Sequence, residues 1–252
     1  MGFGTRSNGC GSSLQTMTVR GAREGEMRHL FRIAVVMMFS LTFTHTGFCG
    51  DWGGMIGGTY WRPDWDRERS DGSTDGLFGP SVSIRFKDLI LSAQYYTGEF
   101  DIDFPGSSRT YSADRTDLDI ALSCRFLGFL NATVGYKNID FDWVASYQID
   151  ASISGLAIGA GGSYTFAPGL LLYSSASYMP ALDYRWDYGG VGETFDATGY
   201  TLDAGTGWVF SKIHLMTRIG YRYQSFDVEQ NGSSDILDET NQGFKVDVAY
   251  LF

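Results

Sequence analysis

The last ten residues of the chain are Gly243-Phe244-Lys245-Val246-Asp247-Val248-Ala249-Tyr250-Leu251-Phe252. Every second one is apolar or aromatic, namely Phe244, Val246, Val248, Tyr250 and Phe252. The residues between them include the charged pair Lys245 and Asp247. Successive side chains of a β-strand point to opposite faces, so this stretch predicts a strand with one apolar face and one polar face.

The same period of two recurs throughout the chain from residue 53 onward. We predict ten strands, at residues 53–61, 77–87, 88–100, 115–126, 129–142, 150–166, 169–186, 195–210, 212–226 and 242–252. Eight strands remain an alternative, because the first segment and the fifth and sixth segments alternate least regularly. The chain is therefore predicted to be all-β.

The connections between these segments alternate in length. Four are tight turns, at Lys87-Asp88, Leu127-Gly128, Ala167-Pro168-Gly169 and Ser211-Lys212. The other five are mostly longer and polar, at residues 62–76, 101–114, 143–149, 187–194 and 227–241. This layout is typical of a membrane-spanning antiparallel up-and-down β-barrel with short periplasmic turns and longer extracellular loops. An even strand number also places both chain ends on the turn side.

Charged residues alternate with apolar ones inside several predicted strands. A charge on the lipid-facing side of a barrel is costly, so we expect these side chains to face the lumen and pair there. The predicted lumen charge network comprises Arg85, Arg125, Asp183, Arg185, Arg218, Arg222, Lys245 and Asp247, and the same alternation includes Lys137 and Asp203. In a soluble barrel, the alternative, the apolar face would point inward instead.

Aromatic residues fall into two predicted bands, as expected for girdles at the two membrane surfaces. The band at the turns and the chain end contains Phe86, Phe126, Phe129, Phe166, Phe210 and Phe252. The band toward the loops contains Trp61, Tyr95, Tyr136, Tyr184, Trp186, Tyr221 and Tyr223.

An export signal precedes the strands. Basic residues follow Met27, the apolar run 33–43 comes next, and small residues lead to Cys49, so residues 27–49 are predicted to be a cleaved signal peptide. The run is too short for a membrane helix. Lipidation of Cys49 is disfavoured because Phe48 occupies the small-residue position of a lipobox. Residues 1–26 are expected to be a disordered or mis-annotated extension with translation starting at Met27, and residues 50–252 to be the barrel domain.

The closing segment Gly243–Phe252 resembles the terminal β-signal of bacterial outer-membrane proteins, which ends in phenylalanine after alternating apolar residues. The resemblance covers ten residues and implies recognition by the barrel-assembly machinery. It also implies a Gram-negative cell envelope, location in the outer membrane, and contact with outer-membrane lipid and lipopolysaccharide. It assigns no activity.

The sequence has few residue patterns that indicate catalysis or ligand binding. The net charge of −10 argues against a nucleic-acid partner. His214 is the only histidine after the signal peptide. Lys212 lies two residues before it and Met216 two residues after it, so neither the Asp-x-His of omptin proteases nor the His-x-Ser of lipid A deacylases is present. We therefore expect His214 to be a polar lumen residue near the turn-side mouth, and we predict no catalytic, cofactor-binding or metal-binding residues.

Acidic residues offer one alternative to that prediction. The pairs Asp101-x-Asp103, Asp117-x-Asp119 and Asp140-x-Asp142 each place two carboxylates on one strand face, where they could bind calcium or pair with arginines. The acidic loop 227–241 is expected to be solvated, or else to bridge lipopolysaccharide through cations.

The predicted function is a structural or surface-interaction role for a barrel whose polar lumen is largely filled by side chains. The first alternative is a narrow porin-like channel for small solutes, and the second is an enzyme of unrecognised type. Small residues along one face of the sixth segment, Gly155, Ala157, Gly159, Gly161 and Ser163, either make room for arginines opposite them or widen a passage.

Overall fold

The computed structural model describes residues 52–67, 70–103, 110–144, 148–229 and 236–252. The predicted extension 1–26 and signal peptide 27–49 lie outside these residues. Within the described part of the chain, no helix is long and apolar enough to span a membrane.

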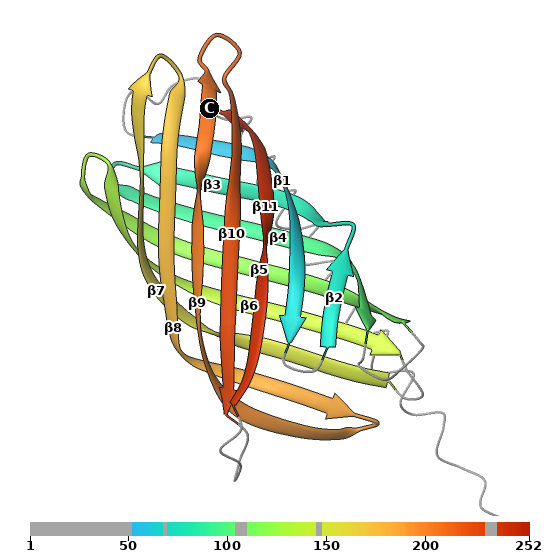
Figure 1. Ribbon diagram of the computed structural model, residues 1–252. Helices are drawn as coiled ribbons and strands as arrows, with labels where there is room; N and C mark the ends of the chain where they lie inside the picture. The colour runs from blue at the N-terminus through green and yellow to red at the C-terminus, as the bar shows by residue number, and fades with distance from the viewer. Residues whose placement is uncertain (1–51, 68–69, 104–109, 145–147, 230–235) are drawn as a thin grey trace, which may run out of the picture. The chain divides into compact units, whose positions relative to one another are not determined.

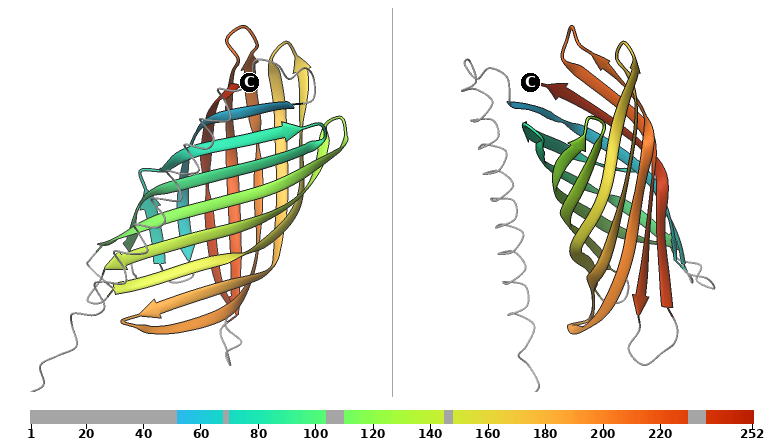
Figure 2. Two further views of the ribbon diagram at one scale, coloured as in Figure 1. Left: turned by 180° about the vertical axis from the view of Figure 1, so that it is seen from behind. Right: turned by 90° about the vertical axis from the view of Figure 1, so that its left-hand side faces the viewer.

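The strands form one antiparallel sheet that closes on itself (Figures 1 and 2). They are β1 (Trp52–Arg67), β2 (Ser70–Thr74), β3 (Leu77–Phe86), β4 (Leu89–Asp103), β5 (Thr110–Leu127), β6 (Leu130–Val144), β7 (Gln148–Ala167), β8 (Leu170–Tyr188), β9 (Val191–Phe210), β10 (Leu215–Glu229) and β11 (Ile236–Leu251). Each pairs with its sequence neighbours except β2 and β3, which both pair with β1 and β4. β11 pairs with β1 from Met55–Leu251 to Arg67–Glu239.

β2 and β3 occupy one position in the barrel, since both lie between β1 and β4. The two segments are separated by Asp75 and Gly76, where the side chain of Tyr60 donates a hydrogen bond to the Asp75 carbonyl. Gly76 has a φ of 127°, and a Cβ there would collide with the Tyr60 ring, so only glycine fits. The barrel thus has ten strands, which confirms the predicted number and excludes eight.

The two faces of β11 follow the predicted alternation. The apolar set is exposed on the outside, with exposed fractions of 67% for Phe244, 37% for Val246, 45% for Val248, 51% for Tyr250 and 49% for Phe252. Lys245 and Asp247 point inward and are only 3% and 2% exposed. An apolar outer face with charges inside is the reverse of a soluble barrel.

Most of the predicted aromatic band at the turn end is confirmed, because Phe86, Phe126, Phe166, Phe210 and Phe252 are exposed at outward positions. Phe129 is exposed too, but it borders the cavity inside the barrel. The band at the loop end is partly wrong. Trp61 and Tyr184 lie inside the barrel, at 0% and 3% exposure, and Trp186 packs against the interior cluster. Tyr136 and Tyr221 are exposed on the outside as predicted. The other outward aromatics toward the loops, which the prediction did not include, are Tyr60, Phe78, Tyr178, Tyr200 and Phe244.

A β-bulge in β8 explains the error at Tyr184. Between Met179 and Leu182, β8 carries one more residue than either neighbouring strand, and the register shifts against both β7 and β9. An extra residue exchanges the two faces of everything beyond it. Met179 and Leu182 are therefore both buried inside, whereas Asp183 and Arg185 are exposed on the outside and not in the lumen as predicted.

The loop ends are more regular than predicted. Strands continue into the segments expected to be loops, and β7 and β9 reach 20 residues each. The predicted loop 187–194 is a two-residue turn at Gly189 and Gly190, whose φ values of 59° and 90° suit a type I′ hairpin turn. The Asp187 carboxylate accepts a hydrogen bond from the Gly190 N–H at 2.9 Å. Above the membrane both faces of a strand can be polar, so the sequence of a strand there need not alternate between apolar and polar residues.

The bulge generates a prediction about side-chain accessibility. In a Cys124→Ser background, we expect Asp183→Cys to react with a hydrophilic maleimide about tenfold faster than Tyr184→Cys, because a buried thiol reacts slowly. Arg185→Cys is the matched control and should react like Asp183→Cys. Faster labelling at position 184 than at 183 would show that the faces of β8 are not exchanged.

Candidate functional site

The barrel interior is divided into three zones along its axis. The loop end holds a cluster of aromatic and aliphatic side chains, the middle holds paired charges, and the turn end holds an open cavity. The interior is the place where a small barrel either conducts, binds or is closed, so each zone is described in turn.

The loop-end zone is apolar, which the prediction of a polar lumen missed. Its buried members are Trp61, Trp65, Leu77, Tyr96, Phe100, Ile102, Ala113, Ile139, Phe141, Trp143, Ile149, Ala151, Ile153, Met179, Leu182, Tyr184, Ala197, Phe226 and Val228. Ring contacts connect the strands across it, with 5.1 Å between the centroids of Trp143 and Trp186 and 6.3 Å between those of Trp61 and Tyr96. This end of the barrel is packed like the core of a soluble domain.

Arg115 connects the apolar zone to the charged one. Its guanidinium binds the Asp117 carboxylate with two donors, Nε to Oδ1 at 2.6 Å and Nη2 to Oδ2 at 2.8 Å, and both side chains are 0% exposed. It also donates hydrogen bonds to Asn241 and, at 3.2 Å, to Gln224. A bidentate pair of this kind is among the stronger polar contacts in proteins.

Aromatic rings surround the same guanidinium. Its central carbon lies 5.4 Å from the Trp61 ring, 5.5 Å from Phe100 and 5.0 Å from Phe141. Cation–π attraction strengthens when both groups are shielded from water, as they are here. Arg115 thus contacts aromatic rings on β1, β4 and β6 and hydrogen-bond acceptors on β5, β10 and β11.

A second group of charges lies on the turn side of Arg115. Arg222 donates from Nε to Asp203 at 3.1 Å, and Lys245 donates to the same Asp203 oxygen at 3.0 Å. The Asp119 carboxylate forms ion pairs with Lys137 and, at 3.5 Å, with Arg222. The Arg222 guanidinium also lies over aromatic rings, 5.5 Å from Trp61 and 5.4 Å from Tyr96.

Asp247 completes this group. It forms ion pairs with Arg218 at 3.0 Å and with Lys245 at 3.8 Å, and it accepts a hydrogen bond from the Thr59 hydroxyl at 2.6 Å. The buried or ion-paired interior cations are Arg115, Lys137, Arg218, Arg222 and Lys245, and the buried or ion-paired interior anions are Asp117, Asp119, Asp203, Glu239 and Asp247. These two sets are equal in number, and Arg85 and Arg125 add two cations at inward positions nearer the turns.

The structure brings together four of the eight predicted network residues, namely Arg218, Arg222, Lys245 and Asp247. Arg85 and Arg125 lie on inward-facing positions of β3 and β5 near the turns, outside the group of ion pairs. Asp183 and Arg185 are outside the barrel because of the β8 bulge.

The prediction missed Arg115 and its partners. The spacing Arg115-x-Asp117-x-Asp119 puts all three on one strand face, and Asp117-x-Asp119 was noted only as a pair of carboxylates that either bind calcium or pair with arginines. In the structure Asp117 forms an ion pair with Arg115, and Asp119 forms one with Lys137. No group of metal-binding side chains is found among the described residues.

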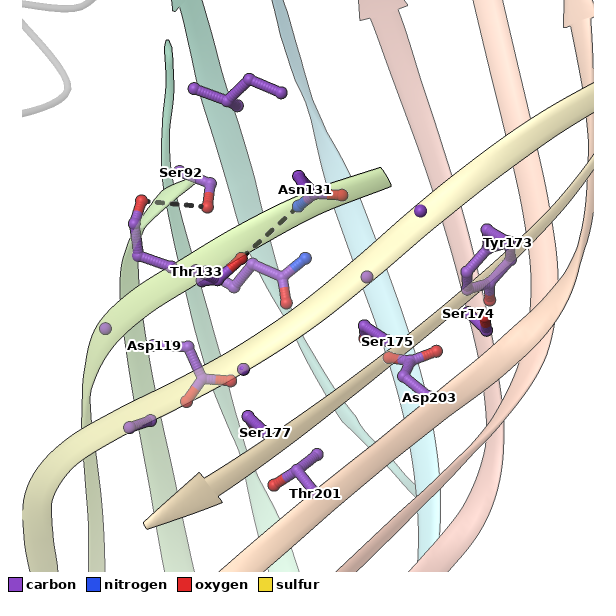
Figure 3. A pocket seen from close by; sticks show the side chains of 18 of the residues that line it. Ser92, Asp119, Asn131, Thr133, Tyr173, Ser174, Ser175, Ser177, Thr201 and Asp203 are labelled. Carbon is purple, nitrogen blue, oxygen red and sulfur yellow. Dashed lines mark hydrogen bonds between the residues drawn. The ribbon is translucent and has the colours of Figure 1, made fainter. Parts of the chain in front are cut away.

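The turn-end zone is a cavity of about 370 Å³ (Figure 3). Figure 3 shows Ser92, Asn131 and Thr133 on one side of it and Ser175, Ser177 and Thr201 on the other. The charged residues Asp119, Lys137, Asp203, Arg222 and Lys245 also line it, together with Arg125, Gly128 and Phe129 near the turn between β5 and β6.

Small residues provide the space for this cavity. Gly159, Gly161 and Ser163 of β7 line it, so the small face of the predicted sixth segment borders open space as well as the arginines Arg218 and Arg222. On the facing wall, Tyr173 packs over the paired glycines Gly205 and Gly220, where its hydroxyl occupies the space that a Cβ at Gly220 would need.

His214 is not a lumen residue, as had been expected. It lies in the turn between β9 and β10 with a φ of 54° and an exposed side chain, and its ring centroid is 6.1 Å from that of Tyr250. The turn spans Ser211–His214 and not the two predicted residues, so His214 lies outside the strand that would have directed it inward.

Comparisons with solved structures agree with this architecture. The outer membrane protease OmpT from Escherichia coli has a TM-score of 0.54 at 10% identity, over 83% of this chain and 99% of that one. Neisserial surface protein A has a TM-score of 0.40 at 12% identity, over 78% of this chain and 96% of that one. The translocator domain of the autotransporter NalP from Neisseria meningitidis has a TM-score of 0.42 at 16% identity, over 92% of this chain and 98% of that one.

At such identities the likeness concerns the fold alone, and the fold is that of the bacterial outer-membrane β-barrels. No protein-family model matches the chain. No curated protein matches it.

The buried pair of Arg115 and Asp117 generates a stability prediction. Arg115→Met should lower the free energy of unfolding by about 3–5 kcal/mol, because it leaves Asp117 buried without its cation. The double variant Arg115→Met/Asp117→Leu should recover most of that loss. Urea unfolding of the protein refolded into lipid vesicles measures both.

The control for this experiment is Arg185→Met, which removes an exposed arginine from the outer face. It should change the free energy of unfolding by no more than about 0.5 kcal/mol. A double variant as unstable as the single one would show that Asp117 does not depend on Arg115.

Proposed function

We propose that this protein is an integral outer-membrane barrel with a closed interior and a structural or surface-interaction role. One observation carries the proposal: the middle of the barrel is filled by side chains that have no exposure at all. Trp61, Tyr96, Arg115, Asp117, Gln224 and Asn241 are each 0% exposed. A barrel that conducts solutes requires a continuous path past this layer.

The energetics of the layer favour a permanent closure. Arg115 in this layer is paired with Asp117, and Arg222 next to it is paired with Asp203; aromatic rings lie over both arginines. Withdrawing one side chain would leave its partner unpaired in a region without water, which is costly. The porin-like alternative is therefore ranked below the structural role.

The surface-interaction role is supported by the length of the strands. About 9–11 residues of tilted strand cross a bilayer, whereas β7, β8 and β9 have 20, 19 and 20 residues. The excess lies at the loop end, beyond the outward aromatics, where the outer surface carries charged residues such as Asp183, Arg185 and Asp196. A rigid, water-exposed β-structure of this kind suits contact with other molecules outside the cell.

Membrane location is supported by the outer surface. Between the two aromatic bands the exposed side chains are apolar, including Leu91, Leu122, Val134, Ile158 and Ile219. We propose outer-membrane lipid and lipopolysaccharide as the partners of this surface. We propose that the barrel-assembly machinery recognises the exposed apolar face of β11 during insertion.

An enzymatic role is the third candidate. OmpT shows that a barrel of similar fold can be a protease. In this chain the only histidine among the described residues is His214, which is exposed in a turn. The interior carboxylates Asp117, Asp119, Asp203 and Asp247 form ion pairs with arginine or lysine, and we therefore propose that the protein is not an enzyme.

Planar-bilayer recordings test the closed interior. We expect the refolded protein to show no discrete conductance steps, because the buried layer blocks the lumen. A Trp61→Ala/Arg115→Ala variant should produce steps, since it removes two large side chains from that layer. The control variant Phe129→Ala changes the open mouth at the turn end and leaves the buried layer intact, so it should show no conductance steps. Discrete steps from the unmodified protein would contradict the proposal and favour the channel.

A further inference from the structure

The turn-end cavity is lined by more cations than carboxylates. Its cationic residues are Arg125, Lys137, Arg218, Arg222 and Lys245. Its carboxylates are Asp119 and Asp203, and the buried Asp247 is the ion-pair partner of Arg218 and Lys245. Even with Asp247 counted, five cations meet three carboxylates, so this end of the lumen carries an excess of two positive charges.

The excess is opposite in sign to the charge of the chain. The whole sequence has a net charge of −10, so its composition alone would lead to an acidic lumen. Arg85 adds to the excess, because it lies at an inward position of β3 opposite Ile90, a residue that lines the cavity. Charges of one sign within low-dielectric walls raise the local concentration of counter-ions, so the cavity attracts small anions.

Arg125 is the lining cation best placed to meet such an anion. It is half-buried and forms no ion pair within the described part of the chain. Asp119 and Asp203 are each already paired with two other cations. The Arg125 backbone N–H donates a hydrogen bond of 2.7 Å to the Asp88 carbonyl, in the turn between β3 and β4. This bond fixes the end of β5 at the mouth of the cavity.

Arg218 supplies a second guanidinium from the opposite wall. Its ion pair with Asp247 is made through Nη2 at 3.0 Å, and its side chain remains 20% exposed, whereas that of Asp247 is 2% exposed. Arg218 lies on β10 and Arg125 on β5, which are five strands apart in the ring of ten. An anion in the cavity is therefore attracted from two sides.

Neutral hydrogen-bond donors lie between these two strands. Asn131 of β6 is opposite Arg125, and Gly161 of β7 separates Asn131 from Ser175 of β8. Gly161 has no side chain, which leaves space between Asn131 and Ser175 (Figure 3). The amide of Asn131 and the hydroxyl of Ser175 can both donate hydrogen bonds to the oxygens of an anion.

We propose that the turn-end cavity binds a small dianionic oxyanion, with Arg125 and Arg218 as its charged partners. A guanidinium matches the paired oxygens of a phosphate or a carboxylate, and two negative charges balance the excess of two positive ones. The volume of about 370 Å³ lies at the lower end of the range for small-molecule sites, which is about 300–1,000 Å³. The anion enters from the side of the short turns, which faces the periplasm in an outer-membrane barrel.

The test uses the variant Arg125→Gln. Arg125 has no ion pair to lose among the described residues, so the melting temperature should stay unchanged, and heat-modifiable migration on a gel verifies that each variant is folded. Arg185→Gln is the matched control, because it makes the same change on the outer surface at the loop end. Arg125→Lys keeps the charge and removes only the guanidinium.

Binding is measured by titration calorimetry on the full chain refolded in uncharged micelles, in a phosphate-free buffer of mildly alkaline pH. Glycerol 3-phosphate and succinate are the dianionic probes, and glycerol and butyrate are their neutral and monoanionic counterparts. Binding of glycerol 3-phosphate alone would identify phosphate as the recognised group, and binding of succinate alone would identify a pair of carboxylates. Either result supports a dianion site.

We expect saturable binding of at least one dianion, weaker binding of glycerol and butyrate, and a loss of about tenfold in dianion affinity in Arg125→Gln. Arg125→Lys should lose less, and Arg185→Gln should bind like the unmodified protein. The proposal is overturned if neither dianion binds, if butyrate binds as tightly, if Arg125→Gln keeps full affinity, or if Arg125→Lys loses as much as Arg125→Gln. The site goes beyond the closed-barrel role, and none of these results bears on conductance, so the two proposals stand or fail separately.

Discussion

The constraint on which this structure depends is that a strand inside a bilayer must find all its hydrogen-bond partners within the protein. Closure of β11 against β1, from Met55–Leu251 to Arg67–Glu239, removes the two edges that an open sheet would leave. Closure in turn creates an inside and an outside. Once these exist, each strand must sort its side chains, with apolar groups toward lipid and charges toward the lumen.

The lumen then poses a second problem, because charges placed there are also removed from water. In this barrel the buried charges form ion pairs: Arg115 pairs with Asp117, and Arg222 and Lys245 both pair with Asp203. Aromatic rings next to the arginines add attraction and fill volume. The same layer therefore satisfies the buried charges and closes the barrel, while the small residues of β7 leave the turn end open as a cavity.

The accuracy of the sequence prediction varies along the strands for a physical reason. Between the aromatic bands one face meets lipid, so alternation is strong, and the faces of β10 and β11 were predicted correctly. Toward the loops the outer face carries polar residues and the inner face packs in an apolar cluster, so an apolar side chain there no longer indicates the lipid-facing side. Trp61 and Tyr184 were assigned to the outer girdle there, although both belong to the interior. The apolar loop-end cluster was missed for the same reason.

By itself the sequence determined the all-β class, the side on which the turns are short and the outward face of the closing strand, because each follows from local alternation and turn chemistry. It left the strand number at ten or eight, and the closed sheet decided for ten. Only the tertiary structure decided which charges meet. Asp183 and Arg185 leave the lumen through one extra residue in β8, and Arg115 meets Asn241 of β11 across the barrel. Such outcomes depend on register between strands distant in sequence, which alternation within a single strand does not encode.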